Sequence, residues 1–184
     1  MTETMIERND CLLVKIGKEK FKDAAGNSVH LVDDPVENAF LNDLENYPHA
    51  FLLACFMDRQ TKSERAWELP IRVKNILGDF SIRKLGEVTK EEYEVMFGAY
   101  SLHRYPDIMA EVFYEAVQRI ITEYDGDASK IWADTPSSAT VVYRLLQFKG
   151  VGVKIATMAA NILARQFKIF FRTIFPSMFP PTCT

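Results

Sequence analysis

Residues 148–156 read Phe-Lys-Gly-Val-Gly-Val-Lys-Ile-Ala and lie between two segments whose apolar residues recur with helical spacing. The apolar positions of residues 142–146 predict one amphipathic helix, and those of residues 155–163 predict a second. Because two glycines interrupt the pattern, the sequence predicts a tight turn between the helices. The helix pair as a whole is expected at about residues 137–165.

This turn has the features of an anion site. Gly150 and Gly152 permit backbone conformations that place successive N–H groups on one side of the chain. These groups lie at the N-terminus of the second predicted helix, where the helix dipole and free N–H groups attract anions. A backbone phosphate would fit such a site. The same pattern also occurs in structural corners that end a helix with glycine and bind nothing, so both interpretations stay open.

The composition indicates one globular domain without broad attraction to nucleic acid. The chain has 184 residues, of which 48% are hydrophobic and 26% charged, and its formal net charge is −3. A length of this order is typical of one domain. A nucleic-acid-binding protein with this charge would have to concentrate its positive potential locally.

Helical periodicity extends over most of the chain. Asp34 followed by Pro35 predicts a helix start, and the segment 49–57 is apolar on all sides, which predicts a buried central helix. Thr61 and Glu64 have the spacing of a capping box. We expect the helix that they open to kink at Pro70 or to restart there.

Two further helices are predicted in the middle of the chain. Thr89 and Glu92 form another capping-box pattern, and Pro106 opens a long amphipathic segment that ends near Tyr124. Asp127 is expected to cap the turn that follows. The fold class is therefore predicted to be all-α: a compact multi-helix domain over residues 35–168.

The two ends of the chain differ from this domain. Residues 1–34 are predicted to be an N-terminal extension without an apolar signal core, and 169–184 form an atypical tail that is apolar and rich in proline. The longest apolar run, 50–57, is too short to cross a bilayer, so no membrane partner is expected. We expect an intracellular protein, cytoplasmic or nuclear.

No metal site is predicted. The cysteines and histidines are scattered and lack metal-ligand spacing, which excludes a Cys-ligated zinc or iron–sulfur site in this chain. They are Cys11, Cys55, Cys183, His30, His49 and His103.

Residues 148–156 resemble the helix–hairpin–helix motif of the endonuclease-III-like DNA glycosylase superfamily, whose usual form is Leu-Pro-Gly-Val-Gly-x-Lys-Thr-Ala. The resemblance extends upstream. Residues 51–61 are similar to the family's buried helix and the Ser-x-Gln-Thr-type stretch that ends it, and 107–127 to the helix and acidic turn before the motif. Together the similar segments span roughly 35–168. Lys149 stands where proline is usual in the family.

The resemblance implies a partner, double-stranded DNA with a damaged base or an abasic site, because the family flips the damaged nucleotide out of the duplex. Gln60 would fill the gap in the duplex; the alternative is a solvated residue at a helix end. The turn would hold a phosphate, and Lys149 would place a cation beside it. A monovalent cation at the hairpin is compatible with the family, and no iron–sulfur cluster is expected. The phosphate-binding residues would be Lys149, Gly150, Val151 and Gly152.

Lys154 matches the lysine nucleophile of the family's bifunctional members. Such a lysine must be neutral to attack the sugar, whereas the ordinary pKa of lysine is about 10.4. We therefore expect Lys154 to be buried beside the helix N-terminus, at one end of a polar stripe that continues through Thr157, Asn161 and Arg165. A lysine that is merely exposed on a helix is the alternative.

The family also needs a carboxylate beyond the lysine, and this chain has no Asp or Glu after Asp134. Permissible codons for 169–184, read in another frame, can encode a segment with the missing aspartate. We therefore expect this chain to be a frameshifted or truncated product. The alternative is that the tail is native and packs as an apolar cap.

The sequence predicts a base-excision-repair DNA glycosylase/AP lyase, impaired by loss of this aspartate. The alternatives are a non-enzymatic DNA-binding module and a helical protein-interaction domain with an incidental glycine corner.

Overall fold

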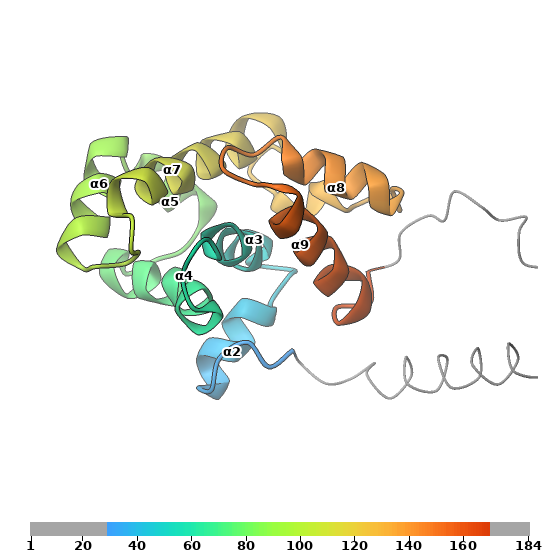
Figure 1. Ribbon diagram of the computed structural model, residues 1–184, viewed down its shortest axis with the longest axis horizontal. Helices are drawn as coiled ribbons and strands as arrows, with labels where there is room; N and C mark the ends of the chain where they lie inside the picture. Colours follow the sequence, from blue (N-terminus) through green and yellow to red (C-terminus); the bar gives the residue numbers. More distant parts are fainter. Residues whose placement is uncertain (1–28, 170–184) are drawn as a thin grey trace, which may run out of the picture.

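The computed structural model describes residues 29–169, which form an all-α domain without β-strands, so the predicted fold class is confirmed (Figure 1). The elements are α2 (Pro35–Asn42), α3 (Pro48–Met57), α4 (Ser63–Leu77), α5 (Ile82–Glu87), α6 (Lys90–Ala99), α7 (Pro106–Glu123), the short 3-10 helix η1 (Ala128–Ile131), α8 (Ser138–Leu146) and α9 (Val153–Arg165).

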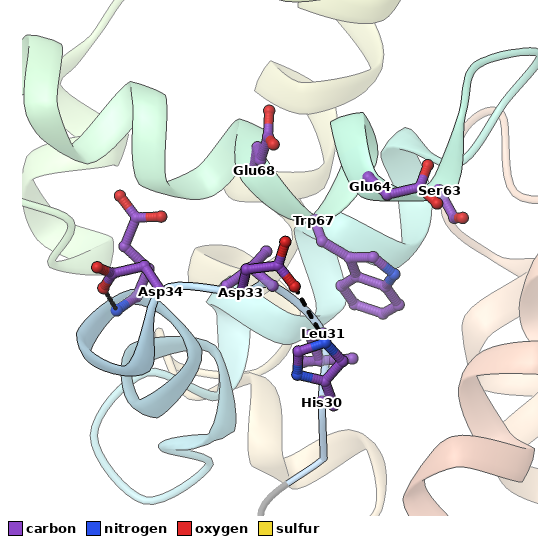
Figure 2. A pocket seen from close by; sticks show the side chains of 10 residues that line it. His30, Leu31, Asp33, Asp34, Ser63, Glu64, Trp67 and Glu68 are labelled. Atoms are coloured by element: carbon purple, nitrogen blue, oxygen red, sulfur yellow. Dashed lines mark hydrogen bonds and ion pairs between the residues drawn. The ribbon is translucent and has the colours of Figure 1, made fainter.

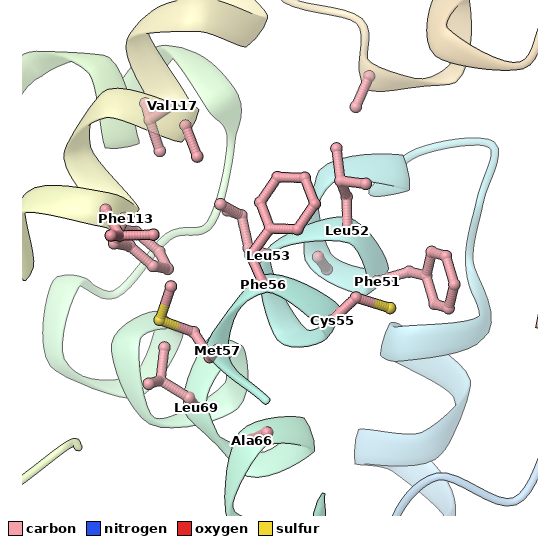
Figure 3. Close-up of a cluster of buried hydrophobic side chains, with 14 of the residues drawn as sticks. Phe51, Leu52, Leu53, Cys55, Phe56, Met57, Ala66, Leu69, Phe113 and Val117 are labelled. Atoms are coloured by element: carbon pink, nitrogen blue, oxygen red, sulfur yellow. The ribbon is translucent and has the colours of Figure 1, made fainter. Parts of the chain in front are cut away.

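The centre of the domain is α3. All its residues are buried, as the sequence predicts, and α2, α4, α7 and α9 pack around it. Figure 3 shows Leu53 and Phe56 of α3 among side chains that include Phe113 of α7 and Leu69 of α4. Complete burial of one such side chain stabilises the fold by about 1.5–3 kcal/mol, so this helix contributes a large part of the core.

Several predicted helix starts are confirmed. Asp34 accepts hydrogen bonds from the N–H groups of Val36 and Glu37, both at 2.9 Å, and so caps α2. Thr89 and Glu92 form a complete capping box at the start of α6. Helix α7 begins at Pro106, where the fixed φ of proline favours a helical start.

One expectation about α4 is wrong, and of the two alternatives at Pro70, a kink or a restart, the restart is excluded. Thr61 and Glu64 do not form a capping box, because α4 begins at Ser63 and its N-cap is Lys62, which provides no side-chain hydrogen bond. The preceding turn contains Gln60 in a left-handed conformation, so the helix begins only after this turn. No second helix starts at Pro70, because α4 continues through it and buries it in the core.

The N-terminal residues that the structure describes are held by asparagine side chains. The N–H groups of Val29 and Leu31 donate to Asn42 Oδ1 and Asn38 Oδ1, at 2.7 and 2.8 Å. At the other end, the Phe167 ring packs edge-on against Phe51 at 5.1 Å.

Most of the predicted extension and nearly all of the 169–184 tail lie outside the described residues. Cys11 and Cys183 lie there too. Between residues 29 and 169, no helix combines the length and apolar character needed to span a bilayer.

His49 is a buried polar residue of α3. Its Nε2 lies 2.7 Å from the carbonyl oxygen of Phe80, and its ring stacks on the Phe80 ring at 5.4 Å. Burial lowers the pKa of His49, and it also lowers that of His103.

We predict that the free energy of unfolding falls as the pH decreases below about 6.5, the ordinary histidine pKa. In that range the unfolded chain binds protons that buried His49 and His103 do not bind, so acid favours unfolding. The slope is at most about 1.4 kcal/mol per pH unit for each histidine. Urea denaturation between pH 7.5 and 5 measures it. His49→Gln should reduce the slope, and equal slopes in the variant and the wild type would contradict the prediction.

Candidate nucleic-acid interface

Helices α8 and α9 are joined by a short turn, residues 147–152, which we call the α8–α9 turn (Figure 1). The N–H of Val151 donates to the carbonyl oxygen of Phe148 at 3.1 Å. Gly150 has φ +76°, and a Cβ atom at this position would lie 2.9 Å from Val112 Cγ2 on α7. Glycine is therefore required here both by the left-handed backbone and by the close approach to α7.

Gly152 has no such constraint. Its φ and ψ are −94° and 175°, extended values that any residue adopts, and a Cβ atom would meet nothing within 4 Å. The expectation that both glycines supply unusual backbone angles is thus wrong for Gly152. This residue is the N-cap of α9 and provides no side-chain hydrogen bond, so the first N–H groups of α9 lack the usual side-chain cap.

The α8–α9 turn is fixed to the domain by two contacts. Arg119 of α7 donates to the carbonyl oxygen of Gln147. The buried ring of Phe148 packs against Phe56, at the end of α3, with 4.9 Å between ring centroids. Because both partners belong to core helices, the position of the turn is set by the core.

Helix α9 buries small residues on its inner face. Ala156, Ala159 and Ala160 are buried, and both α8 and α3 pack against this helix. The opposite face is polar and exposed. The predicted stripe is confirmed at Lys154, Thr157, Asn161 and Arg165.

Lys149 is paired with a carboxylate. Its Nζ lies 3.0 Å from Glu111 Oε1 on α7, and the same oxygen lies 2.8 Å from Lys90 Nζ. Hydrogen bonds from Lys90 and Lys149 lower the pKa of Glu111. The charge of Lys149 is therefore shared with Glu111, which weakens its effect on an anion at the turn.

Lys154 lies in the first turn of α9 and is exposed. The expected burial beside the helix N-terminus is wrong for the free protein. The reason is local: Lys154 belongs to the polar stripe, and the neighbouring positions that pack inward are Ile155 and Ala156.

Gln60 lies in the loop between α3 and α4, residues 58–62, which we call the α3–α4 loop. It is exposed and has φ +53°, a conformation that glutamine seldom adopts. The residue before it, Arg59, reaches the α8–α9 turn: its Nη1 would lie 3.6 Å from a Cβ atom on Gly150. The structure thus brings together two segments that are far apart in sequence and that the sequence analysis assigns to DNA binding.

Arg59 is the residue that the sequence analysis misses. Its only sequence signal is its place directly before Gln60, and nothing in the sequence pairs it with Gly150.

The acidic turn before α8 has a structural role. Asp127 accepts a hydrogen bond from the N–H of Ser129 at 2.9 Å and caps η1, as predicted. Asp125 pairs with Lys130 at 2.7 Å. Within the described part of the chain, no three His, Cys, Asp or Glu side chains lie together as a metal site.

A hollow elsewhere on the molecule contains none of the predicted DNA-binding residues. It lies between the residues around His30 and the start of α4, and its wall includes Asp33, Glu64, Glu68 and Trp67 (Figure 2). Because its carboxylates repel phosphate, it is unsuited to the DNA backbone.

No protein-family model, curated protein or solved structure matches this chain. A functional assignment therefore depends on the residues and geometry described above.

We predict that alanine substitutions at the two glycines lower the free energy of unfolding by different amounts. Gly150→Ala should destabilise the protein by more than about 1 kcal/mol, because alanine is strained in the left-handed region and its Cβ would displace Val112. Gly152→Ala should destabilise the protein less, by roughly 0.5–1 kcal/mol, because alanine is a poorer N-cap than glycine. Urea denaturation measures both variants. A Gly152→Ala variant as unstable as Gly150→Ala would mean that Gly152 is held by contacts that the structure does not contain.

Proposed function

We propose that this protein binds damaged double-stranded DNA through the α8–α9 turn and acts on abasic sites as an AP lyase similar to the endonuclease-III-like enzymes. The observation that carries the proposal is the N-terminus of α9, which has no side-chain cap, follows the left-handed Gly150 and lies next to Arg59. Free N–H groups at a helix N-terminus favour phosphate without a large net positive charge. This agrees with the formal net charge of −3.

In this proposal the α8–α9 turn positions the duplex, and the α3–α4 loop enters it. A phosphate contact carries no sequence information, so binding through the turn would be independent of sequence. Gln60 would occupy the space that a flipped nucleotide leaves, where its amide can hydrogen-bond to the orphaned base. Its exposed, left-handed conformation supports this role, because strained backbone is often found at functional sites.

The proposed lyase reaction starts at Lys154. Its neutral Nζ attacks C1′ of the open-chain abasic sugar, and loss of water gives a Schiff base. Removal of a C2′ proton then expels the 3′ phosphate by β-elimination, and water hydrolyses the Schiff base to regenerate the amine. The strand is cleaved, and no oxidant or metal is consumed.

Base excision would be weak in the chain as printed. Breaking the glycosidic bond places positive charge on the sugar, which a carboxylate stabilises, and no Asp or Glu follows Asp134. Loss of one such electrostatic contact costs about 3–4 kcal/mol, or roughly 10²–10³ in rate. The activity proposed for this chain is therefore lyase action on existing abasic sites rather than efficient removal of damaged bases.

A non-enzymatic DNA-binding module is the second candidate. The exposure of Lys154 favours it, because an exposed lysine is ordinary on a helix surface. The two candidates share the DNA-binding surface and differ only in whether a Schiff base forms.

We predict that borohydride reduction traps a covalent complex between this protein and DNA with an abasic site. Lys154→Gln should abolish the complex, since glutamine has no amine to form the Schiff base. Lys84→Gln on α5 removes another partly exposed lysine and should leave trapping unchanged. The complex is measured by gel electrophoresis under denaturing conditions. Trapping that persists in Lys154→Gln would assign the nucleophile to another amine, and a wild-type protein that binds the DNA without trapping would favour the binding module.

We also predict that Gly152→Asp separates folding from DNA binding. Aspartate is a favourable N-cap and should stabilise α9 by a few tenths of a kcal/mol relative to glycine. Its carboxylate would occupy the N–H groups and repel phosphate, so affinity for abasic DNA should fall at least about tenfold. Gly98→Asp adds the same charge on α6 and should bind DNA like the wild type. Fluorescence anisotropy measures affinity, and undiminished binding by a folded Gly152→Asp protein would refute the phosphate site.

A further inference from the structure

Arg59 lies where the α3–α4 loop meets the α8–α9 turn. Its Nη1 would be 3.6 Å from a Cβ atom on Gly150. Three residues earlier, Phe56 packs against Phe148 of the turn. The aromatic contact joins the end of α3 to the turn, so the loop that carries Arg59 starts beside the turn.

Arg59 is exposed, and its side chain makes no hydrogen bond or ion pair with residues 29–169. Its charge is therefore not neutralised within this part of the chain. Two other cations close to the turn are paired: Lys149 with Glu111, and Arg119 with Glu123 at 2.7 Å. Among residues 29–169, the unpaired positive charge near the turn comes from Arg59 and from exposed Lys154 in the first turn of α9.

The backbone that carries Arg59 is held by His103, a buried residue of the segment before α7. Its Nδ1 accepts a hydrogen bond from the N–H of Tyr105 at 3.1 Å, so the proton of the neutral ring is on Nε2. Nε2 then donates to the carbonyl oxygen of Met57, 3.2 Å away, at the end of α3. These bonds tie the start of the α3–α4 loop to the start of α7.

We infer that Arg59 binds a phosphate of the DNA backbone together with the N–H groups of the α8–α9 turn, an inference that rests on the proposed function. A guanidinium group presents two parallel N–H donors that match two phosphate oxygens. The turn supplies the remaining donors from the opposite side. Arg59 is thus a phosphate-binding residue that connects the loop entering the duplex with the turn that positions it.

The arrangement also explains how an acidic protein could bind DNA. One unneutralised guanidinium beside free helix N–H groups concentrates positive potential at a single point, while the rest of the surface stays mixed in charge. Binding would then depend on few phosphate contacts, and each should be visible in the salt dependence.

The test compares Arg59→Gln with Arg83→Gln on a duplex containing one abasic site. Arg83 lies on α5, is highly exposed and, within residues 29–169, pairs only with Glu87 of the same helix, so its removal is a matched loss of charge. Arg59→Gln should weaken binding about tenfold and reduce the slope of log affinity against log salt by about one, the contribution of one phosphate contact. Arg83→Gln should change neither quantity.

A second measurement locates the contact. Single phosphates near the abasic site are replaced in turn by neutral methylphosphonates. One position should weaken the wild type and leave Arg59→Gln unaffected, because the variant has already lost that contact. Arg59→Lys, which keeps the charge but loses the paired donors, should lie between wild type and Arg59→Gln.

The outcomes separate the two proposals. If the wild type does not bind the duplex, the proposed function is wrong. Suppose instead that the wild type binds and that Gly152→Asp weakens binding. If folded Arg59→Gln then matches Arg83→Gln in affinity and salt slope, the Arg59 inference is overturned while the proposed function stands. If circular dichroism shows that Arg59→Gln is unfolded, Arg59→Lys decides: no loss of affinity and no methylphosphonate position that affects only the wild type would also overturn it.

Discussion

Burial of α3 on all sides sets the geometry of the proposed interface. Every residue of this helix is buried, and α2, α4, α7 and α9 pack around it. The end of the helix is fixed at the same time: Phe56 supports the α8–α9 turn, and the carbonyl oxygen of Met57 binds His103. The loop that follows therefore leaves the core at a defined point. A large-to-small substitution in α3 would therefore disturb the proposed DNA-binding surface as well as lower the stability.

The proposed interface is built from connecting segments on a rigid support. Gly150 lies against Val112, and Arg119 holds the carbonyl oxygen of Gln147, so α7 supports the turn along much of its length. This division is common in proteins, since loops carry function and the packed elements position them. Here α3 supports one segment and α7 the other.

Much of the fold was predictable because local sequence determined it. The apolar run of α3, the capping box at Thr89 and the periodicity of α7 each describe one element, and each was confirmed. The start of α4 was not predictable from the Thr61–Glu64 spacing, because the left-handed Gln60 changes the path of the chain just before it.

The candidate site was less predictable, because its features depend on contacts between distant segments. The sequence predicts the glycine turn but cannot distinguish Gly150 from Gly152, which differ in backbone conformation and in the approach of Val112 to Gly150. Neither the pairing of Lys149 with Glu111 nor the place of Arg59 beside Gly150 has a local signal. Lys154 was expected to be buried on the basis of chemistry, but its helix position places it outside.

The way the α8–α9 turn is held has a consequence for the thermodynamics of binding. Association normally loses free energy when loops and side chains become ordered in the complex. In this turn the Phe148 ring is already buried, Val151 already has its hydrogen bond, and Gly150 is already in its left-handed conformation. The turn itself therefore has little entropy left to lose when a phosphate arrives. In the proposed complex the protein's entropic cost would come instead from exposed side chains such as Arg59 and Gln60, which would become ordered against the DNA.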